Sequence, residues 1–251
     1  MLDIAKIKAI SFDLDDTLWP IWPTIKRAER ALLDWLSSHA PMAAALCADP
    51  GVLRQIRDDL GASRPDLRHD LSAMRREAIR LALDRAGENP LLAEPAFEVF
   101  FAERQRVALF DDAKDALGFL SARFPLVSVS NGNADLARVG LAPYFRAAIS
   151  AREFGVGKPD PRIFHAAAGA LDLRPQDLLH VGDDATLDAL GALDAGMQAA
   201  WLNRADHLWP HEATPHVTLT NLGELCALFI GVAKRAATAL SPQGPSGPPP
   251  R

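Results

Sequence analysis

The chain has 251 residues, with 27 lysines and arginines against 32 aspartates and glutamates, and its formal net charge is −5. This acidic balance argues against a partner held mainly through a phosphate backbone, so we expect no nucleic-acid partner. The shares of 49% hydrophobic and 24% charged residues are ordinary for a globular protein and exclude disorder of the whole chain.

The two cysteines, Cys47 and Cys226, are too few for a disulfide scaffold and indicate a reducing compartment. The N-terminal segment carries Asp3 and two lysines among its apolar residues, which is unlike a signal peptide. No apolar run approaches the roughly 20 residues that a membrane-spanning helix needs. We therefore expect a cytoplasmic protein without a membrane partner.

Short apolar runs that end at polar residues predict four buried strands, at 7–13, 125–130, 178–182 and 198–202. Helical spacing predicts helices between them, at 111–122, 160–171 and 186–195. Strands that alternate with helices are typical of a parallel sheet covered on both faces. The predicted fold is therefore α/β, a Rossmann-like doubly wound parallel sheet whose ligands lie beyond the carboxyl ends of the strands.

The stretch 24–107 interrupts this alternation, because it contains several helical patterns and no convincing strand. We interpret residues 21–107 as an inserted all-helical domain and residues 1–20 and 108–240 as the α/β core. The last eleven residues, 241–251, hold five of the 19 prolines and almost nothing apolar, which predicts a disordered tail.

Two acidic residues follow the first predicted strand, Asp13 and Asp15 in the segment DLDDT. Carboxylates two apart at the end of a strand project the same way, so they can face one point in space. Two crowded anions need a cation or a shared proton. The pair indicates Mg²⁺, a proton shuttle, or both, although an acidic turn whose aspartates cap a helix would use the same residue types.

Two further segments offer groups that bind phosphate oxygens. Ser130, Asn131 and the neighbouring backbone N–H groups follow the second predicted strand, with Asn133 placed to cap a following helix. Lys158, between Gly157 and Pro159, could supply positive charge to a bound phosphoryl group. A plain turn and a solvated surface lysine would explain each segment taken by itself.

The fourth segment, HVGDDATLD, ends a predicted strand and opens a helix. Asp183 stands where a carboxylate can reach a metal shared with the first loop, and Asp188 could orient Lys158 or a metal-bound water. We interpret Asp184 as a helix cap and His180, which lies inside an apolar strand, as a hydrogen-bonded core residue.

In this order the four segments resemble the motifs of the haloacid dehalogenase (HAD) superfamily, and the resemblance spans residues 7–202. It implies that Asp13 is a nucleophile forming an aspartyl-phosphate and that Asp15 is the acid/base residue. It also implies an Mg²⁺ ion held by Asp13, the backbone carbonyl of Asp15, and Asp183. Ser130, Asn131 and Lys158 would bind the phosphoryl oxygens. Asp188 would orient Lys158 or a metal-bound water without contacting the phosphoryl group itself.

The resemblance does not by itself decide the reaction. The dehalogenase branch has no aspartate at the position of Asp15, so this residue and Asp183 favour hydrolysis of a phosphomonoester. A phosphotransferase or phosphomutase uses the same acid pair and stays an alternative, as does a non-catalytic binding scaffold, although every matched position holds a competent residue. The substrate would be a small phosphorylated metabolite, and the protein a monomer or a homodimer.

The helical insertion corresponds to the superfamily's first type of cap, which selects the substrate. The segments FDLDDTLW, SNGNA, HVGDD, GMQAAWL and PHVTL are similar to bacterial HAD phosphatases that act on flavin mononucleotide (FMN) or on the phosphorylated ribitylaminouracil precursor of riboflavin. Within the cap, Trp22, His69 and Arg75 are the candidate specificity residues. Packing at the base of the cap, or a solvated helix face, would explain these residues equally well.

Overall fold

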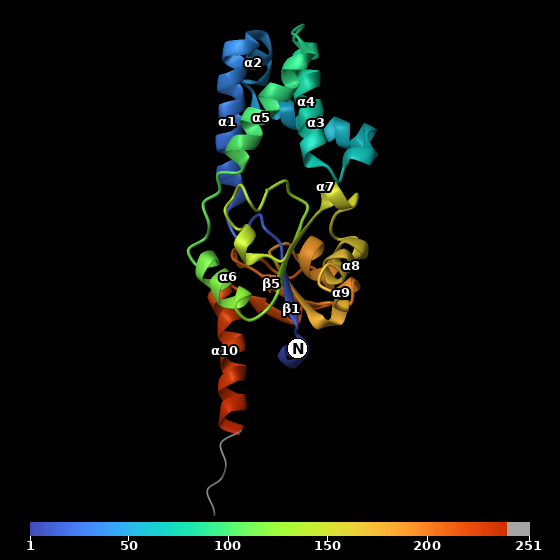
Figure 1. Ribbon diagram of the computed structural model, residues 1–251. Helices are drawn as coiled ribbons and strands as arrows, with labels where there is room; N and C mark the ends of the chain where they lie inside the picture. The colour runs from blue at the N-terminus through green and yellow to red at the C-terminus, as the bar shows by residue number, and fades with distance from the viewer. Residues whose placement is uncertain (240–251) are drawn as a thin grey trace, which may run out of the picture.

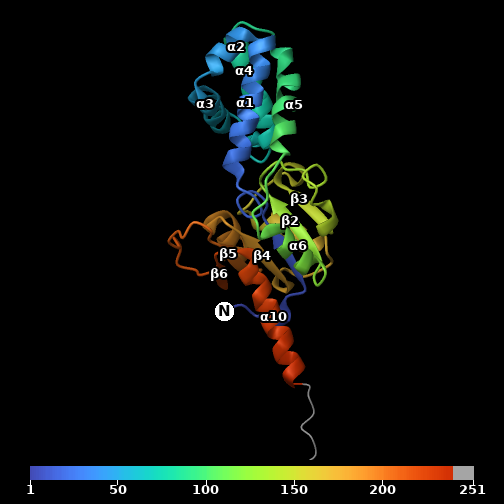
Figure 2. The same cartoon turned by 90° about the vertical axis from the view of Figure 1, so that its left-hand side faces the viewer.

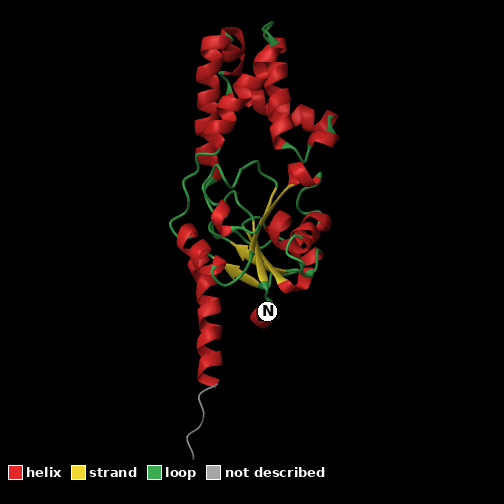
Figure 3. Ribbon diagram, viewed as in Figure 1, coloured by secondary structure: helices red, strands yellow, loops and turns green. Residues whose placement is uncertain are grey.

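In a computed structural model of the protein, residues 1–239 are described, and the tail expected at 241–251 lies outside them. A helical unit stands above an α/β unit, and the two are joined by the segments on either side of the helices (Figure 1). Within the described part of the chain, strands occur only in the α/β unit (Figure 3). Among the described residues, no helix has the length and apolar character needed to cross a bilayer.

The sheet has six parallel strands in the order β3-β2-β1-β4-β5-β6, so the predicted doubly wound α/β fold is confirmed. Its strands are β1 (Ala9–Phe12), β2 (Leu126–Ser130), β3 (Ala147–Ser150), β4 (Leu178–Gly182), β5 (Gln198–Leu202) and β6 (Val217–Leu219). Because the strand order reverses on either side of β1, a crevice opens beyond its carboxyl end, between the ends of β2 and β4.

Helices cover both faces of the sheet, which is why its central strands are apolar on both sides. Ile10 and Phe12 of β1 belong to the hydrophobic cluster formed with α6 (Ala113–Ser121) and α10 (Leu222–Ala239). On the opposite face, α8 (Pro161–Gly169) and α9 (Gly191–Asp194) pack through Phe164 and Ala192 in a second cluster. Figure 2 shows α6 and α10 on the first of these faces.

The sequence patterns predicted four strands and missed β3 and β6. Both are edge strands, and both include residues that stay partly exposed. The continuous apolar run that marks a buried strand is therefore absent from them. The helix expected at 186–195 begins as a π-helical segment, η6 (Ala185–Leu190), and continues as α9.

The helical unit has five α-helices and, among the described residues, no strand: α1 (Ile21–His39), α2 (Pro41–Cys47), α3 (Pro50–Ser63), α4 (Leu71–Arg85) and α5 (Ala93–Arg104). Ala28, Leu32 and Leu36 recur every four residues on α1 and pack against Phe97 and Phe100 of α5. A second cluster joins α3 to α4. These two clusters hold α1 and α5 together on one side and α3 and α4 on the other.

The remaining connections contain short helices: η1 (Ile4–Lys6), η2 (Pro65–Leu67), η3 (Pro90–Leu92), η4 (Ala142–Tyr144), α7 (Ala151–Phe154) and η5 (Pro175–Asp177). Local capping explains where several longer helices begin. Asp49, Asp70 and Asp160 each accept a backbone N–H from the first turn of α3, α4 and α8.

Candidate active site

Asp13 lies at the carboxyl end of the central strand. Its backbone N–H donates to the carbonyl of Val181 on β4 at 2.9 Å, which continues the strand pairing up to this residue. The Asp13 residue is 7% exposed. The carboxylate therefore stands at the crevice where a doubly wound sheet binds its ligands.

Lys158 reaches Asp13 from the loop before α8. Its Nζ lies 2.5 Å from Asp13 Oδ1 and 2.5 Å from Asp188 Oδ1, and the lysine is buried. The loop is fixed by Asn131, whose Oδ1 accepts the Lys158 N–H at 2.7 Å and whose Nδ2 donates to the Lys158 carbonyl at 2.9 Å. Two motifs that are 27 residues apart are thereby tied together.

The Asp188 carboxylate is held by three sets of donors. Besides Lys158, the Asp184 N–H donates to Oδ2 at 3.0 Å, and His180 Nε2 lies 3.2 Å from Oδ1. Because a carboxylate oxygen only accepts, Nε2 carries the ring proton, and Nδ1 accepts from the Ser11 hydroxyl at 2.9 Å. His180 is thus hydrogen-bonded in the core, as the sequence predicted, and also fixes Asp188.

Gly182 makes room for this arrangement, because a Cβ at that position would collide with the Asp188 carboxylate. Asp184 caps the following helix through the N–H groups of Thr186 and Leu187, as expected. Asp183 directly follows β4, and its Oδ1 accepts the Thr17 hydroxyl at 3.1 Å. Carboxylate oxygens of Asp13, Asp183 and Asp188 all lie within 4.8 Å of one another.

The charges of this cluster do not balance. Three carboxylates share one ammonium group, that of Lys158. Burial and the neighbouring carboxylates raise the pKa of Asp13 well above its ordinary value, and burial followed by Asp188 raises the pKa of Asp183 to about 7. Burial opposes ionisation of Asp188 as well, but Lys158 and His180 hold its pKa below the ordinary value.

The imbalance is what a divalent cation would correct, so the residues present fit one. The oxygens of Asp188 already accept three hydrogen bonds, whereas those of Asp13 and Asp183 each accept one. Asp13 and Asp183 are therefore the carboxylates with free lone pairs toward the crevice. Carboxylate oxygens are the ligands that Mg²⁺ prefers.

Asp15 is held by a residue that the sequence patterns did not single out. Nη2 of Arg104, at the end of α5, lies 2.7 Å from both carboxylate oxygens of Asp15, and the Arg104 side chain is 2% exposed. The indole N–H of Trp19 donates to Asp15 Oδ1 at 2.8 Å. The sequence did contain a signal for Arg104. Phe97, Phe100 and Arg104 share one helical face, and a charged side chain at the end of such an apolar stripe needs a partner when it is buried.

The loop after β2 comes close to Asp15, and a Cβ at Gly132 would collide with Asp15 Oδ2. Ser130 is buried, and its hydroxyl accepts the Gly132 N–H at 3.0 Å. The expectation that Asn133 caps a helix is wrong, because no helix follows it directly. Its side chain donates instead to the Ser72 hydroxyl of α4 at 3.1 Å, which links the core loop to the helical unit.

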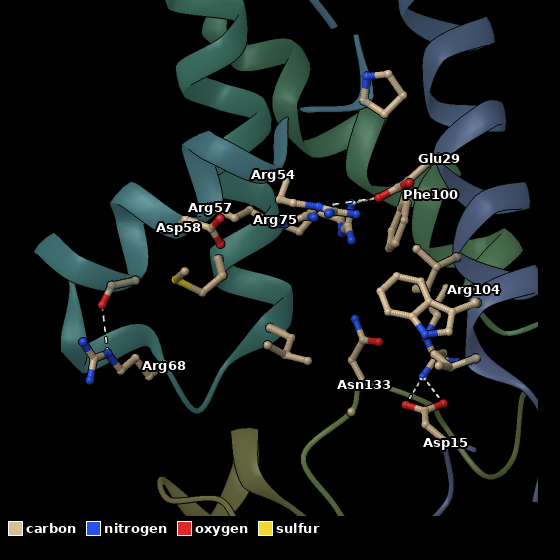
Figure 4. A pocket seen from close by; sticks show the side chains of 18 of the residues that line it. Asp15, Glu29, Arg54, Arg57, Asp58, Arg68, Arg75, Phe100, Arg104 and Asn133 are labelled. Carbon is tan, nitrogen blue, oxygen red and sulfur yellow. Dashed lines mark hydrogen bonds and ion pairs between the residues drawn. The ribbon is translucent and has the colours of Figure 1, made fainter. Parts of the chain in front are cut away.

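A cavity of about 740 Å³ lies between the helical unit and the core, with Asp15, Arg104 and Asn133 at its core end (Figure 4). Two of the candidate specificity residues, Trp22 and Arg75, line it, and Trp22 is 60% exposed. His69 does not line it; His69 lies on the wall of a smaller cavity together with Asn131 and Lys158.

A family model described as haloacid dehalogenase-like hydrolase matches residues 7–196. Among characterised proteins, the chain is 32% identical over 234 residues to the 5-amino-6-(5-phospho-D-ribitylamino)uracil phosphatase YigB of Escherichia coli, covering 90% of this chain and 98% of that protein. It is 36% identical over 157 residues to the phosphoserine phosphatase of Thermus thermophilus, covering 60% of this chain and 63% of that protein.

Among solved structures, one described as a 2-haloacid dehalogenase from Pseudomonas syringae pv. Tomato DC3000 has a TM-score of 0.84 and 38% identity, covering 90% of this chain and 99% of that chain. The HAD phosphatase of Thermococcus onnurineus has a TM-score of 0.65 and 24% identity over 89% of this chain and 98% of its own, a likeness of fold. The resemblance inferred from the sequence motifs is thereby confirmed.

Proposed function

We propose that this chain, which belongs to the haloacid dehalogenase-like hydrolase family, is an Mg²⁺-dependent phosphomonoesterase that works through an aspartyl-phosphate. The observation that carries the proposal is the shared contact of Lys158 with Asp13 and Asp188. It puts a buried cation beside a carboxylate that has free lone pairs and stands at the mouth of the crevice.

Hydrolysis then takes place in two displacements at phosphorus. An oxygen of Asp13 forms a bond to phosphorus while the ester P–O bond breaks, and Asp15 gives its proton to the leaving alkoxide oxygen. Asp15 next takes a proton from a water whose oxygen attacks phosphorus, and the Asp13–phosphorus bond breaks to release inorganic phosphate. One acid/base residue thus serves both halves.

The other residues hold the phosphoryl group and its charge. Lys158 Nζ, the Ser130 hydroxyl and the Asn131 backbone N–H would bind the phosphoryl oxygens. Asp13, the backbone carbonyl of Asp15, and Asp183 would hold Mg²⁺, which neutralises phosphoryl charge in the transition state. Asp188 acts as a positioning residue that keeps Lys158 in the crevice.

For the substrate we propose a small phosphorylated metabolite, with FMN or phosphorylated ribitylaminouracil as the first choice, since the Escherichia coli relative acts on the latter. Residues 21–107 would serve as the cap over a core made of residues 1–20 and 108–240. The cavity between cap and core, with Trp22 and Arg75 in its wall, has the size of a small-molecule site. In the smaller cavity beside Lys158, His69 would contact the substrate near its phosphoryl group.

A dehalogenase is the second candidate, because the solved structure of highest overall similarity described above carries that description. Removal of halide needs no proton for the leaving group, so a dehalogenase does not require an acid/base carboxylate such as that of Asp15. The pair of Asp15 and Arg104 favours the phosphatase. A phosphotransferase would use the same residues and needs an acceptor hydroxyl.

One panel tests these alternatives. Phosphate release is measured from a set of phosphate esters that includes FMN, with and without Mg²⁺, and halide release is measured from a 2-haloacid. Phosphate release that requires Mg²⁺ and no added acceptor supports the proposal. Halide release without phosphate release favours the dehalogenase, and phosphate transfer only when an acceptor alcohol is present favours the phosphotransferase.

A further inference from the structure

The cap side of the 740 Å³ cavity carries more positive charge than its own acids can neutralise. Arg57 of α3 and Arg75 of α4 both approach Glu29 Oε1, at 3.6 Å and 3.4 Å, so two guanidinium groups share one carboxylate. Arg54 of α3 lines the same end of the cavity. In Figure 4 these arginines and Glu29 gather on the side of the cavity away from Asp15.

Arg75 is held in place by its neighbours, and Arg57 has an unsatisfied donor. The Arg75 guanidinium lies 3.8 Å from the centre of the Phe100 ring, which fixes its plane. Nη1 of Arg57 is shielded from solvent and makes no hydrogen bond, because Glu29 Oε1, at 3.6 Å, lies just outside hydrogen-bond distance. A buried donor without an acceptor costs free energy that a ligand oxygen would recover. Burial and the nearby Arg57 also lower the pKa of Arg75, to about 9.

The wall beside these arginines suits a flat group. Trp22 of α1 is 60% exposed and lines the same cavity, so its indole is available for contact with a ligand. Arginine presents its donors in a planar fork that matches two oxygen acceptors in one plane. A carboxylate offers such a pair to one fork. The two carbonyl oxygens of a pyrimidinedione ring lie in one plane on either side of an N–H, so each of them would meet a different guanidinium group.

We propose that Arg57 and Arg75 bind the end of the substrate remote from its phosphate, through a flat group that carries two oxygen acceptors. This inference rests on the proposed phosphatase function and narrows its substrate class. The phosphoryl group lies at Asp13 and Lys158, the substrate chain crosses the cavity, and the acceptor group contacts the two guanidinium groups. Phosphate esters that lack such a group are poor substrates.

Three esters with chains of similar length serve as probes. FMN carries a pyrimidinedione edge, 6-phosphogluconate carries a carboxylate, and sorbitol 6-phosphate carries a neutral hydroxymethyl group in place of that carboxylate. We expect the wild-type protein to hydrolyse at least one of the first two with a higher kcat/KM than sorbitol 6-phosphate. Which of the two is preferred identifies the acceptor group.

Arg57→Gln and Arg75→Gln are then compared with Arg76→Gln. Arg76 is the matched control, since it is the next residue on α4, pairs with Glu94 and does not line the cavity. For the preferred ester, each cavity variant lowers kcat/KM about 10- to 100-fold, the loss of a charged hydrogen bond. The cavity variants lower the value for sorbitol 6-phosphate much less than that for the preferred ester, and Arg76→Gln leaves both esters unchanged.

Arg75→Lys guards against misfolding, because it keeps the charge but loses the planar fork, and it should fall between wild type and Arg75→Gln. Equal loss on all three esters in folded variants would overturn the inference, and so would unchanged preference in both cavity variants. The inference also fails if the wild-type protein hydrolyses sorbitol 6-phosphate with a kcat/KM equal to those for the other two esters. Absence of turnover on every ester of the wider panel would instead refute the proposed function.

Discussion

Replacing Arg104 with methionine tests how the carboxylate of Asp15, the proposed acid/base residue, is held. The change keeps the length and much of the volume of the side chain but removes Nη2, which lies 2.7 Å from both Asp15 oxygens. Nη1 of Arg104 is buried without a partner, so its removal leaves no acceptor unsatisfied. Asp15 keeps one donor, the Trp19 indole.

The expected loss of stability follows from burial. Breaking a buried ion pair by removing one partner costs several kcal/mol; we expect about 3 kcal/mol here, because the Asp15 side chain stays 22% exposed and can be rehydrated. A thermal scan and a urea titration measure it. Arg106→Met is the matched control, since Arg106 follows closely in the chain, is 74% exposed and pairs with Glu103 rather than with Asp15.

The effect on catalysis depends on the leaving group. A carboxylate that is no longer fixed protonates an alkoxide poorly, and we expect kcat/KM for an alkyl phosphate to fall about 100-fold. An aryl phosphate with an acidic phenol needs little proton donation, so it should lose much less. The assay measures phosphate released from both esters by wild type, Arg104→Met and Arg106→Met.

A second background separates positioning from general damage. In Asp15→Asn, whose acid/base group is already gone, Arg104→Met should cost little further activity. Equal losses on the alkyl and aryl esters, or the same loss in the Asp15→Asn background as in wild type, would refute the reasoning. Arg104 would then serve only the structure.

Three other outcomes follow from the site. Asp183→Asn should raise the Mg²⁺ concentration for half-maximal activity about 10- to 100-fold while the fold persists, and an unchanged Mg²⁺ titration would remove Asp183 from the metal site. Gly182→Ala should lower both Tm and activity, because its Cβ displaces the Asp188 carboxylate, and wild-type values for both would contradict the geometry. Burial raises the pKa of Cys47 to about 11. Because the thiolate is the reactive form, the alkylation rate of Cys47 in the Cys226→Ser background should rise about tenfold per pH unit up to that pH. A plateau of the rate near pH 9 would contradict the burial of Cys47.

Much of the core could be predicted from the sequence because its strands are buried on both faces. β1, β2, β4 and β5 each present a run of apolar residues that ends at a polar side chain. Asp13, Ser130 and Asp183 stand at or just past the ends of three of these strands, and parallel strands bring their carboxyl ends to one edge. Local patterns therefore sufficed to bring these residues together.

The features that were missed depend on contacts between distant segments. β3 and β6 are edge strands with partly exposed residues, so their sequence carries little periodic signal. Arg104 meets Asp15 across 89 residues, and a helical pattern alone does not identify the partner of a buried charge. Asn133 was assigned as a cap because its residue type favours one, but the Ser72 contact depends on where α4 packs.

The Asp13 carboxylate is the proposed nucleophile, and Asp13→Asn tests this role most directly. The variant should keep the circular dichroism spectrum and the cooperative unfolding of the wild-type protein. With Mg²⁺ and the best ester of the panel, we expect it to release no phosphate above the rate without protein. Measurable Mg²⁺-dependent turnover by the folded variant would contradict the claim.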